Sequence, residues 1–207
     1  MVSADHGLDE DAFAVLNAVV LKKSATADIL AASTGVAPSA VARIVGELVD
    51  AGYLVDLGGQ VMPDDSAVDT VKSYNEAHWS GLRGQPEVER WHQRFEHVND
   101  LMLAAIDAWQ QVRVGGEKIR NDHTDAAYDD KIISRIDGII AKAEELLRQL
   151  GKRVPRFNRY PERFEAAMNQ VEQDRRYISD PRVESVHNVW FEMHEDIFLL
   201  LGKERQV

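Results

Sequence analysis

The sequence predicts a mainly α-helical protein, with three helices and a β-hairpin first and an antiparallel bundle of about four helices after them. Three observations predict this fold class. Apolar residues recur at helical spacing, proline and glycine stand where helices would begin and end, and Gly58-Gly59 separates two short apolar stretches. We expect domains at residues 1–64 and 87–207, with residues 65–86 as a connector helix and linker.

Three helices are expected before the hairpin. Ile29 and Leu30 form the apolar face of the second helix, and Gly35 allows the tight turn after it. Pro38 stands at the first position of the third helix, where a missing N–H is tolerated. The inward face of the third helix should pack against the first helix, with Val41, Ile44, Val45 and Leu48 contacting Phe13, Leu16 and Val20.

A β-hairpin is expected directly after the third helix. Gly52 ends that helix, and Tyr53, Val55 and Leu57 then alternate as the residues of a strand do. Gly58-Gly59 suits a two-residue turn with positive φ angles, and Val61 would begin the return strand.

The stretch from Ala12 to Met62, about a quarter of the chain, resembles the winged helix-turn-helix modules of bacterial regulators of the MarR and GntR types. The resemblance is carried by Asp28–Val61 and implies that the third helix enters the major groove of double-stranded DNA. It assigns base contacts to the outward face of that helix and phosphate contacts to the end of the first helix: Ser39, Ala40, Arg43 and Glu47, with Lys22 and Lys23.

The charge of this segment opposes DNA binding. Residues 1–73 hold four cations against eleven carboxylates, a balance of −7, and the whole chain carries −11. Because neutralisation of phosphates by Lys and Arg supplies most non-specific affinity for DNA, such a module should bind weakly. The sequence therefore leaves open an alternative function, in which an acidic winged helix docks on a protein partner.

Proline and glycine mark the remaining elements. Ser66 is expected to cap the connector helix, with Asp69 three residues later. Thr124 should cap the second bundle helix. Helices should begin at Pro86, Pro161 and Pro181 and end at Gly115-Gly116, Gly151 and Gly202.

The predicted bundle helices carry apolar residues that alternate at spacings of three and four, which is typical of bundle seams. The third of these helices places Arg175 in its seam. That arginine either reaches a buried carboxylate or marks an opening toward a partner or ligand. The seams are Trp91, Phe95, Val98, Met102, Ala105, Trp109 and Val112; Ile133, Ile136, Ile140, Ala143, Leu147 and Leu150; Phe164, Met168, Val171 and Ile178; and Val183, Val186, Trp190, Met193, Ile197 and Leu200.

Several bundle residues are candidates for binding a small effector or an anion. His187 and His194 lie seven residues apart on one helix face, where they would meet His97, or else simply pack beside the seam. The basic and aromatic stretch 152–163 either holds a phosphate or pairs with nearby carboxylates. The candidate contacts are His97, His187, His194, Arg175, Arg156 and Arg159.

Other functions find little support in the sequence. The chain has no cysteine, so it can form neither a disulfide nor a thiolate zinc site. It contains no nucleotide-binding or hydrolase motif, and we expect neither an enzyme nor a cofactor. Two Glu-x-x-His motifs, Glu89–His92 and Glu184–His187, would form a di-iron site only at one level of the bundle, and antiparallel helices place them at opposite ends. We therefore expect no metal.

The acidic start MVSADHGLDED lacks the positive charge of a secretory signal, and no apolar run is long enough to cross a bilayer. We expect a cytoplasmic, homodimeric transcription regulator in which the first domain binds DNA and the bundle dimerises and is a candidate sensor of a small molecule. No membrane association is expected.

Overall fold

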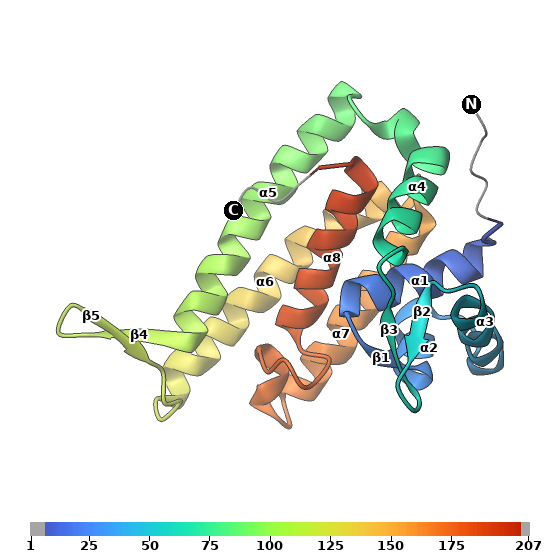
Figure 1. The fold of residues 1–207 in the computed structure, drawn as a ribbon. Helices are drawn as coiled ribbons and strands as arrows, with labels where there is room; N and C mark the ends of the chain where they lie inside the picture. The colour runs from blue at the N-terminus through green and yellow to red at the C-terminus, as the bar shows by residue number, and fades with distance from the viewer. Residues whose placement is uncertain (1–6, 204–207) are drawn as a thin grey trace. The chain divides into compact units, whose positions relative to one another are not determined.

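The computed structural model of the 207-residue chain describes residues 7–203 (Figure 1). The first six residues of the acidic start, MVSADH, lie outside the described residues. The mainly α-helical class is confirmed, with small antiparallel sheets beside the helices. The chain divides into two compact units: unit 1 comprises Met1–Gln85 and Phe191–Val207, and unit 2 comprises Pro86–Trp190.

Unit 1 begins with a helix, a two-residue strand, two more helices and a hairpin. The strands form an antiparallel sheet in the order β1-β3-β2. Strand β1 was not predicted, because two residues are too few for an alternating pattern. The elements are α1 (Glu10–Lys22), β1 (Ala25–Thr26), α2 (Ala27–Thr34), α3 (Pro38–Asp50), β2 (Leu54–Asp56), β3 (Gln60–Pro63), α4 (Ala67–Trp79), the 3-10 turn η1 (Ser80–Leu82) and the later part of α8 (Val186–Leu201).

Helix α3 packs as its sequence predicts. Pro38 is its first residue, and Val41, Ile44 and Leu48 lie in one buried core with the predicted partners on α1. Val45 is only partly buried. The prediction for α2 is half wrong: Leu30 is fully buried, but Ile29 is 43% exposed, because a two-turn helix against α1 and α3 buries a narrow stripe.

The β2–β3 hairpin has the predicted turn, and its two faces differ in burial. Gly58 and Gly59 have φ angles of 78° and 94°, and the amide of Leu57 donates to the carbonyl of Gln60 at 2.8 Å. Leu54 is buried, whereas Val55 and Leu57 face solvent. The residues that alternate in the sequence therefore form the outer face of this strand, and Leu54 between them lies on the inner face.

Helix α4 follows the hairpin without the expected side-chain cap. Ser66 is the N-cap residue, but its hydroxyl donates to the carbonyl of Gly52 at 3.3 Å rather than accepting from the helix. The ring of Tyr74 on α4 stacks on Phe13 of α1 with 3.9 Å between ring centroids. This contact fixes α4 on the core of unit 1.

Unit 2 is built on two long helices joined by a second hairpin. Helices α5 and α6 lie side by side in Figure 1, run in opposite directions, and pack along most of their length. Helix α7 packs against α6, and Trp190, in the first part of α8, contacts Phe95 and Phe164. The elements are α5 (Pro86–Gln110), β4 (Gln111–Val114), β5 (Glu117–Arg120), α6 (Ala126–Gly151), η2 (Pro155–Asn158), α7 (Arg159–Val171), η3 (Arg175–Ile178) and the start of α8.

Several predicted boundaries in unit 2 were wrong. Val112 lies in β4, and Gly115-Gly116 forms the turn of a hairpin rather than only a helix end. Asp125, not Thr124, caps α6: its carboxylate accepts from the amide of Tyr128 at 3.0 Å. The other differences follow from irregular turns: Pro161 is the third residue of α7, Pro181 precedes α8 by five residues, Val183 lies before that helix, and Ile178 lies in η3.

Within residues 7–203, no single helix is long and apolar enough to cross a membrane. The pair α2 and α3 meets the length and composition criteria only when the two helices are taken together, and they are bent by 115°.

Candidate functional site

The outward face of α3 holds the residues predicted to read DNA. Ser39, Arg43 and Glu47 are exposed, and Ala40 is partly buried. Arg43 Nη1 donates to both carboxylate oxygens of Glu47, at 2.7 and 2.8 Å. These hydrogen bonds are the main reason that the pKa of Arg43 is raised above its ordinary value. The one cation on this face is therefore paired with a carboxylate one helical turn away.

The two lysines predicted to touch phosphate differ in their surroundings. Lys22 Nζ donates to Glu192 Oε1 at 3.0 Å, and the two side chains are 6% and 8% exposed. Lys23, the next residue, is exposed and ends α1 with a φ angle of 66°. Only Lys23 has the accessibility that a phosphate contact requires.

The outer face of the β2–β3 hairpin is apolar. Val55 and Met62 are cross-strand partners, and both are exposed, at 41% and 40%. Leu57 is two residues beyond Val55, so it lies on the same face, and it is 61% exposed. We call these three residues the apolar hairpin face.

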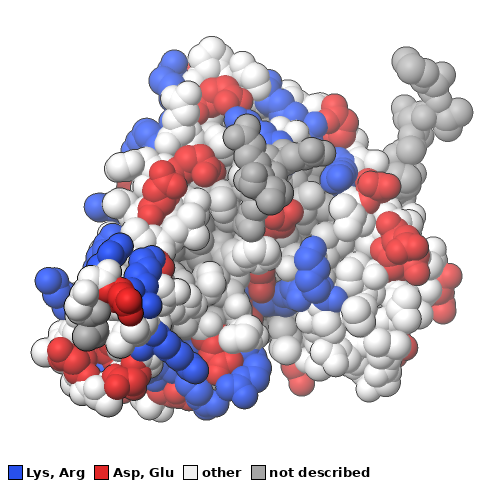
Figure 2. Space-filling view, turned by 60° about the vertical axis from the view of Figure 1, so that its left-hand side comes forward, with Lys and Arg blue, Asp and Glu red and all other residues white. Residues whose placement is uncertain are grey.

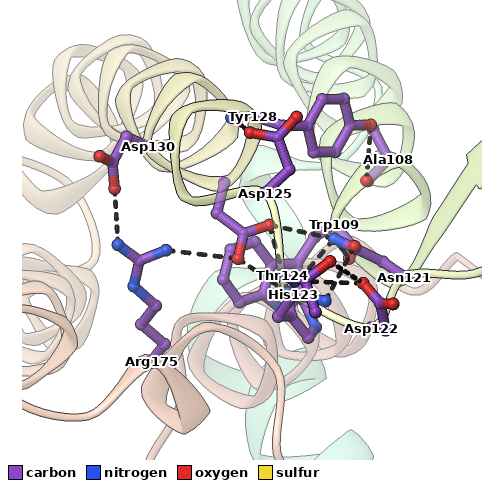
Figure 3. Close-up of polar contacts among 11 residues, drawn as sticks. Ala108, Trp109, Asn121, Asp122, His123, Thr124, Asp125, Tyr128, Asp130 and Arg175 are labelled. Carbon is purple, nitrogen blue, oxygen red and sulfur yellow. Dashed lines mark hydrogen bonds and ion pairs between the residues drawn. The ribbon is translucent and has the colours of Figure 1, made fainter.

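A second candidate site centres on Asp129 in the first turn of α6. This carboxylate is fully buried, yet it has three polar neighbours, Asn121, His123 and Arg175, which Figure 3 labels. Asn121 Nδ2 donates to Oδ1 at 3.0 Å, while His123 Nδ1 and Arg175 Nη1 lie 3.0 and 3.3 Å from Oδ2. Three donors around one buried carboxylate satisfy its need for hydrogen bonds.

The hairpin side of this network is tied to the end of α5. Asn121 Nδ2 also donates to the carbonyl of Trp109 at 3.0 Å, and its Oδ1 accepts from the amide of His123 at 3.1 Å. The ring centroids of His123 and Trp109 lie 4.4 Å apart. The backbone of His123 adopts a φ of 59°, which is uncommon for a residue other than glycine. Tyr128 adds a hydrogen bond from its hydroxyl to the carbonyl of Ala108 at 2.9 Å.

Arg175 closes the network from the other side, as Figure 3 shows. Its second terminal nitrogen donates to Asp130 at 2.7 Å, next to the contact with Asp129. The first of the two alternatives for this arginine is therefore confirmed, since it reaches a buried carboxylate. It belongs to η3 rather than to a bundle seam.

A pocket of about 960 Å³ lies beside this network, between the β4–β5 hairpin and the η3 region. We call it the β4–β5 pocket. Five cations and two carboxylates are among its lining residues. The charged ones are Lys118, Arg120, Arg175, Arg176, Arg182, Asp174 and Asp180, and the uncharged ones include Trp109, Gln111, Ile119, Asn121 and Pro181.

The predicted effector histidines do not all belong to one unit. His97 lines a groove of about 810 Å³ between α5 and α6. His187, in unit 2, is half-buried, and burial lowers its pKa below the ordinary value. His194, in unit 1, is buried beside the ring of Phe198. Among residues 7–203, no group of three or more His, Asp or Glu side chains is arranged to hold a metal ion.

The basic stretch near η2 is engaged with its neighbours. The Arg156 guanidinium lies 4.9 Å from the centre of the Phe157 ring. Arg159 pairs with Glu162, and the buried Arg163 pairs with Glu184. These contacts support the interpretation of this stretch as a set of structural ion pairs rather than a phosphate site.

The Glu-x-x-His motifs also have structural partners. His92 lies 3.3 Å from Glu96, one turn along α5, and Glu184 pairs with Arg163. Sequence reasoning missed Asn121, His123 and Asp129 altogether. The pattern QVRV-GG-EKIR, with a glycine turn between two alternating stretches, predicts the β-hairpin that directly precedes Asn121 and His123.

Comparisons with protein-family models, with curated proteins and with solved structures found no match.

Proposed function

We propose that unit 1 is a winged helix-turn-helix module that docks on a protein partner through its β2–β3 hairpin. The order of elements supports this module: a helix, a short strand, two helices joined at Gly35, and a hairpin that pairs with the first strand. The sheet order β1-β3-β2 places the hairpin beside the helices, as a wing requires. The fold alone does not decide what the module binds.

The apolar hairpin face is the observation that carries the docking function. Val55, Leu57 and Met62 expose large side chains together on one side of a hairpin whose other side, with Leu54 and Val61, belongs to the core. Exposed apolar side chains that are contiguous are typical of surfaces that bind proteins. A hairpin that follows a phosphate backbone would instead need cations.

The charges of unit 1 support the same choice. Lys22 is used in a buried ion pair, and Arg43 is paired with Glu47. Arg83 is held by Glu76 and by the carbonyl of Leu200. Each phosphate contact contributes to non-specific DNA affinity, so a module with few accessible cations is poorly suited to bind DNA by itself.

DNA binding by α3 remains the second candidate function, and one observation favours it. The Arg43–Glu47 pair is nearly 60% exposed at both side chains, and surface pairs of this kind contribute little to stability because water screens them. Arg43 can therefore leave Glu47 for a phosphate or a base at little cost. In this case the protein would act as a transcription regulator, and a homodimer would set the spacing of its half-sites.

Matched hairpin variants test the docking function. Leu57→Lys places a charge on the apolar hairpin face, whereas Leu103→Lys places one at an exposed position of α5. The tagged full-length protein is used to capture partners from a nuclease-treated native extract. If the protein docks through the hairpin, the captured amount of one partner should fall at least about tenfold with Leu57→Lys, which corresponds to about 1.4 kcal/mol of binding free energy. The same partner should be captured in full by Leu103→Lys. Equal capture by both variants would contradict the proposal.

Fluorescence anisotropy tests the second candidate with DNA from the gene's own upstream region. Binding that prefers this DNA over a scrambled sequence, survives near-physiological salt and weakens with Arg43→Ala would support a regulator. Equal affinity of the Arg43→Ala variant would remove α3 from recognition.

A further inference from the structure

We infer that the β4–β5 pocket binds a dianionic phosphate group, as free phosphate or as a phosphate monoester. The pocket lies wholly in unit 2, so this inference does not rest on the function proposed for unit 1. The lining holds five cations and two carboxylates, and three further carboxylates pair with two of these cations: Asp107 with Lys118, and Asp129 and Asp130 with Arg175. Figure 2 shows Lys and Arg side chains gathered, with carboxylates among them, on the face of the molecule brought forward there.

One face of the β4–β5 hairpin carries like charges, and three of its residues, Gln111, Lys118 and Arg120, line the pocket. Arg113 and Lys118 are direct cross-strand partners, and Arg120 pairs with Gln111 two positions along. Because side chains alternate along a strand, all four lie on one face of the β4–β5 hairpin. Like charges directly opposite each other destabilise a strand pair. Lys118 Nζ donates to both carboxylate oxygens of Asp107, at 2.9 and 2.8 Å, which offsets this repulsion, so Arg120 is the residue of this face that can supply charge to an anion in the pocket.

The opposite wall presents arginines from the η3 region. Arg176 donates to Asp174 through two nitrogens, at 2.9 and 2.7 Å, and Arg182 pairs with Asp180 in the same way. Each of these arginines lies two residues from its carboxylate and is more than 60% exposed. Because a guanidinium group carries five N–H donors, each of these exposed arginines can also donate to a ligand while it stays paired with its carboxylate.

Arg175 and the Asp129 network have a positioning role in this site. Arg175 is already held by Asp129 and Asp130, which neutralise it. His123 is fixed over Trp109 in an uncommon backbone conformation. Such conformations are concentrated at functional sites. The network therefore holds both walls in place while Arg120, Arg176 and Arg182 supply charge.

The composition of the pocket favours a phosphate over a carboxylate ligand. Guanidinium groups make paired, charge-assisted hydrogen bonds to phosphate oxygens, and two negative charges suit a site with several cations. A volume of about 960 Å³ is much larger than one phosphate and lies in the range of small-molecule sites. The apolar residue Pro181 in the lining would then contact the organic part of an ester.

Calorimetric titration of the full-length protein with inorganic phosphate and with glycerol phosphate tests this inference. Saturable binding of either ligand is expected, tighter for the ester if the natural ligand is a monoester and equal or tighter for phosphate if it is the free ion. The double variant Arg120→Gln/Arg176→Gln should weaken binding at least about tenfold. Arg148→Gln, an exposed arginine of α6 outside the pocket, should leave binding unchanged.

Two results would overturn the inference. One is the absence of saturable heat with both ligands up to about 10 mM, which corresponds to a binding free energy weaker than about 3 kcal/mol. The other is equal affinity of the double variant and the wild type. Circular dichroism of each variant shows whether it is folded, and both substituted residues are exposed, so we expect folding to be retained.

Discussion

Lys22 and Glu192 form a buried ion pair that joins α1 to the later part of α8, with 3.0 Å between Nζ and Oε1. One helical turn further along α8, Asp196 accepts a hydrogen bond from the buried Asn17 at 3.1 Å. Both contacts connect residues about 170 to 180 positions apart within unit 1. Unit 1 thus has a polar seam between its first helix and the last helix of the chain.

We predict that Glu192→Gln destabilises the protein by about 3 kcal/mol, because it removes the carboxylate that pairs with the buried Lys22. Lys23→Ala, at the exposed neighbouring position, should change the free energy of unfolding by less than about 0.5 kcal/mol. Denaturant unfolding measures both values. A Glu192→Gln protein as stable as Lys23→Ala would mean that this pair adds nothing to the fold.

In unit 1, the sequence predicts α3 and the β2–β3 hairpin correctly, because several independent sequence features indicate each of these elements. Pro38, the apolar spacing from Val41 to Leu48 and the glycine pair of the hairpin each indicate the same element that the structure contains. The faces of β2 were not predictable. Residues 53–55 are all apolar, so alternation cannot tell which of them points inward.

Most of the candidate site of unit 2, the Asp129 network and the β4–β5 hairpin, was not predicted from the sequence. Val112 fits the helical spacing of the α5 seam and also the alternation of a strand, and the helical interpretation was chosen. Arg175, the polar residue at an apolar position, indicated either a buried carboxylate or an opening toward a ligand, and the first alternative is the one the structure contains. Its partner Asp129 lies 46 residues away, and a contact at that separation leaves no periodic signal.

Removal of the carboxylate at the centre of the unit 2 network gives a second prediction. Asp129→Ala leaves Asn121, His123 and Arg175 without their shared acceptor, and we expect a loss of about 3 kcal/mol in stability. Asp130→Ala, at an exposed carboxylate on the same helix, should cost less than about 1 kcal/mol. Hydrogen exchange of the β4–β5 amides should accelerate only in the Asp129→Ala protein. Unchanged exchange there would show that the hairpin is held by other contacts.

The Asp180–Arg182 pair gives a prediction for titration. Hydrogen bonds from the Arg182 side chain and amide lower the pKa of Asp180 to about 2. Its carboxylate therefore favours the folded state at pH values above the ordinary pKa, and this contribution is lost as the pH falls toward 2. NMR titration of the Asp180 side-chain carbonyl should give a midpoint well below the ordinary value, and Arg182→Gln should raise it. A midpoint that Arg182→Gln does not change would assign the shift to another group.

His187 gives the last prediction, in which protonation opposes folding. Burial lowers its pKa in the folded protein, so the unfolded chain binds a proton there at a higher pH than the folded chain does. The stability that depends on neutral His187 is therefore complete above its unfolded pKa of about 6.5, and it is lost as the pH falls from there toward the folded pKa. We expect His187→Gln to reduce the loss of unfolding free energy between about pH 7 and pH 5, because glutamine does not titrate. Comparison with His78→Gln, an exposed histidine of α4, separates this effect from general charge effects. If both variants lost stability to the same extent as the wild type over this range, the protonation of His187 would not contribute to the acid sensitivity of the fold.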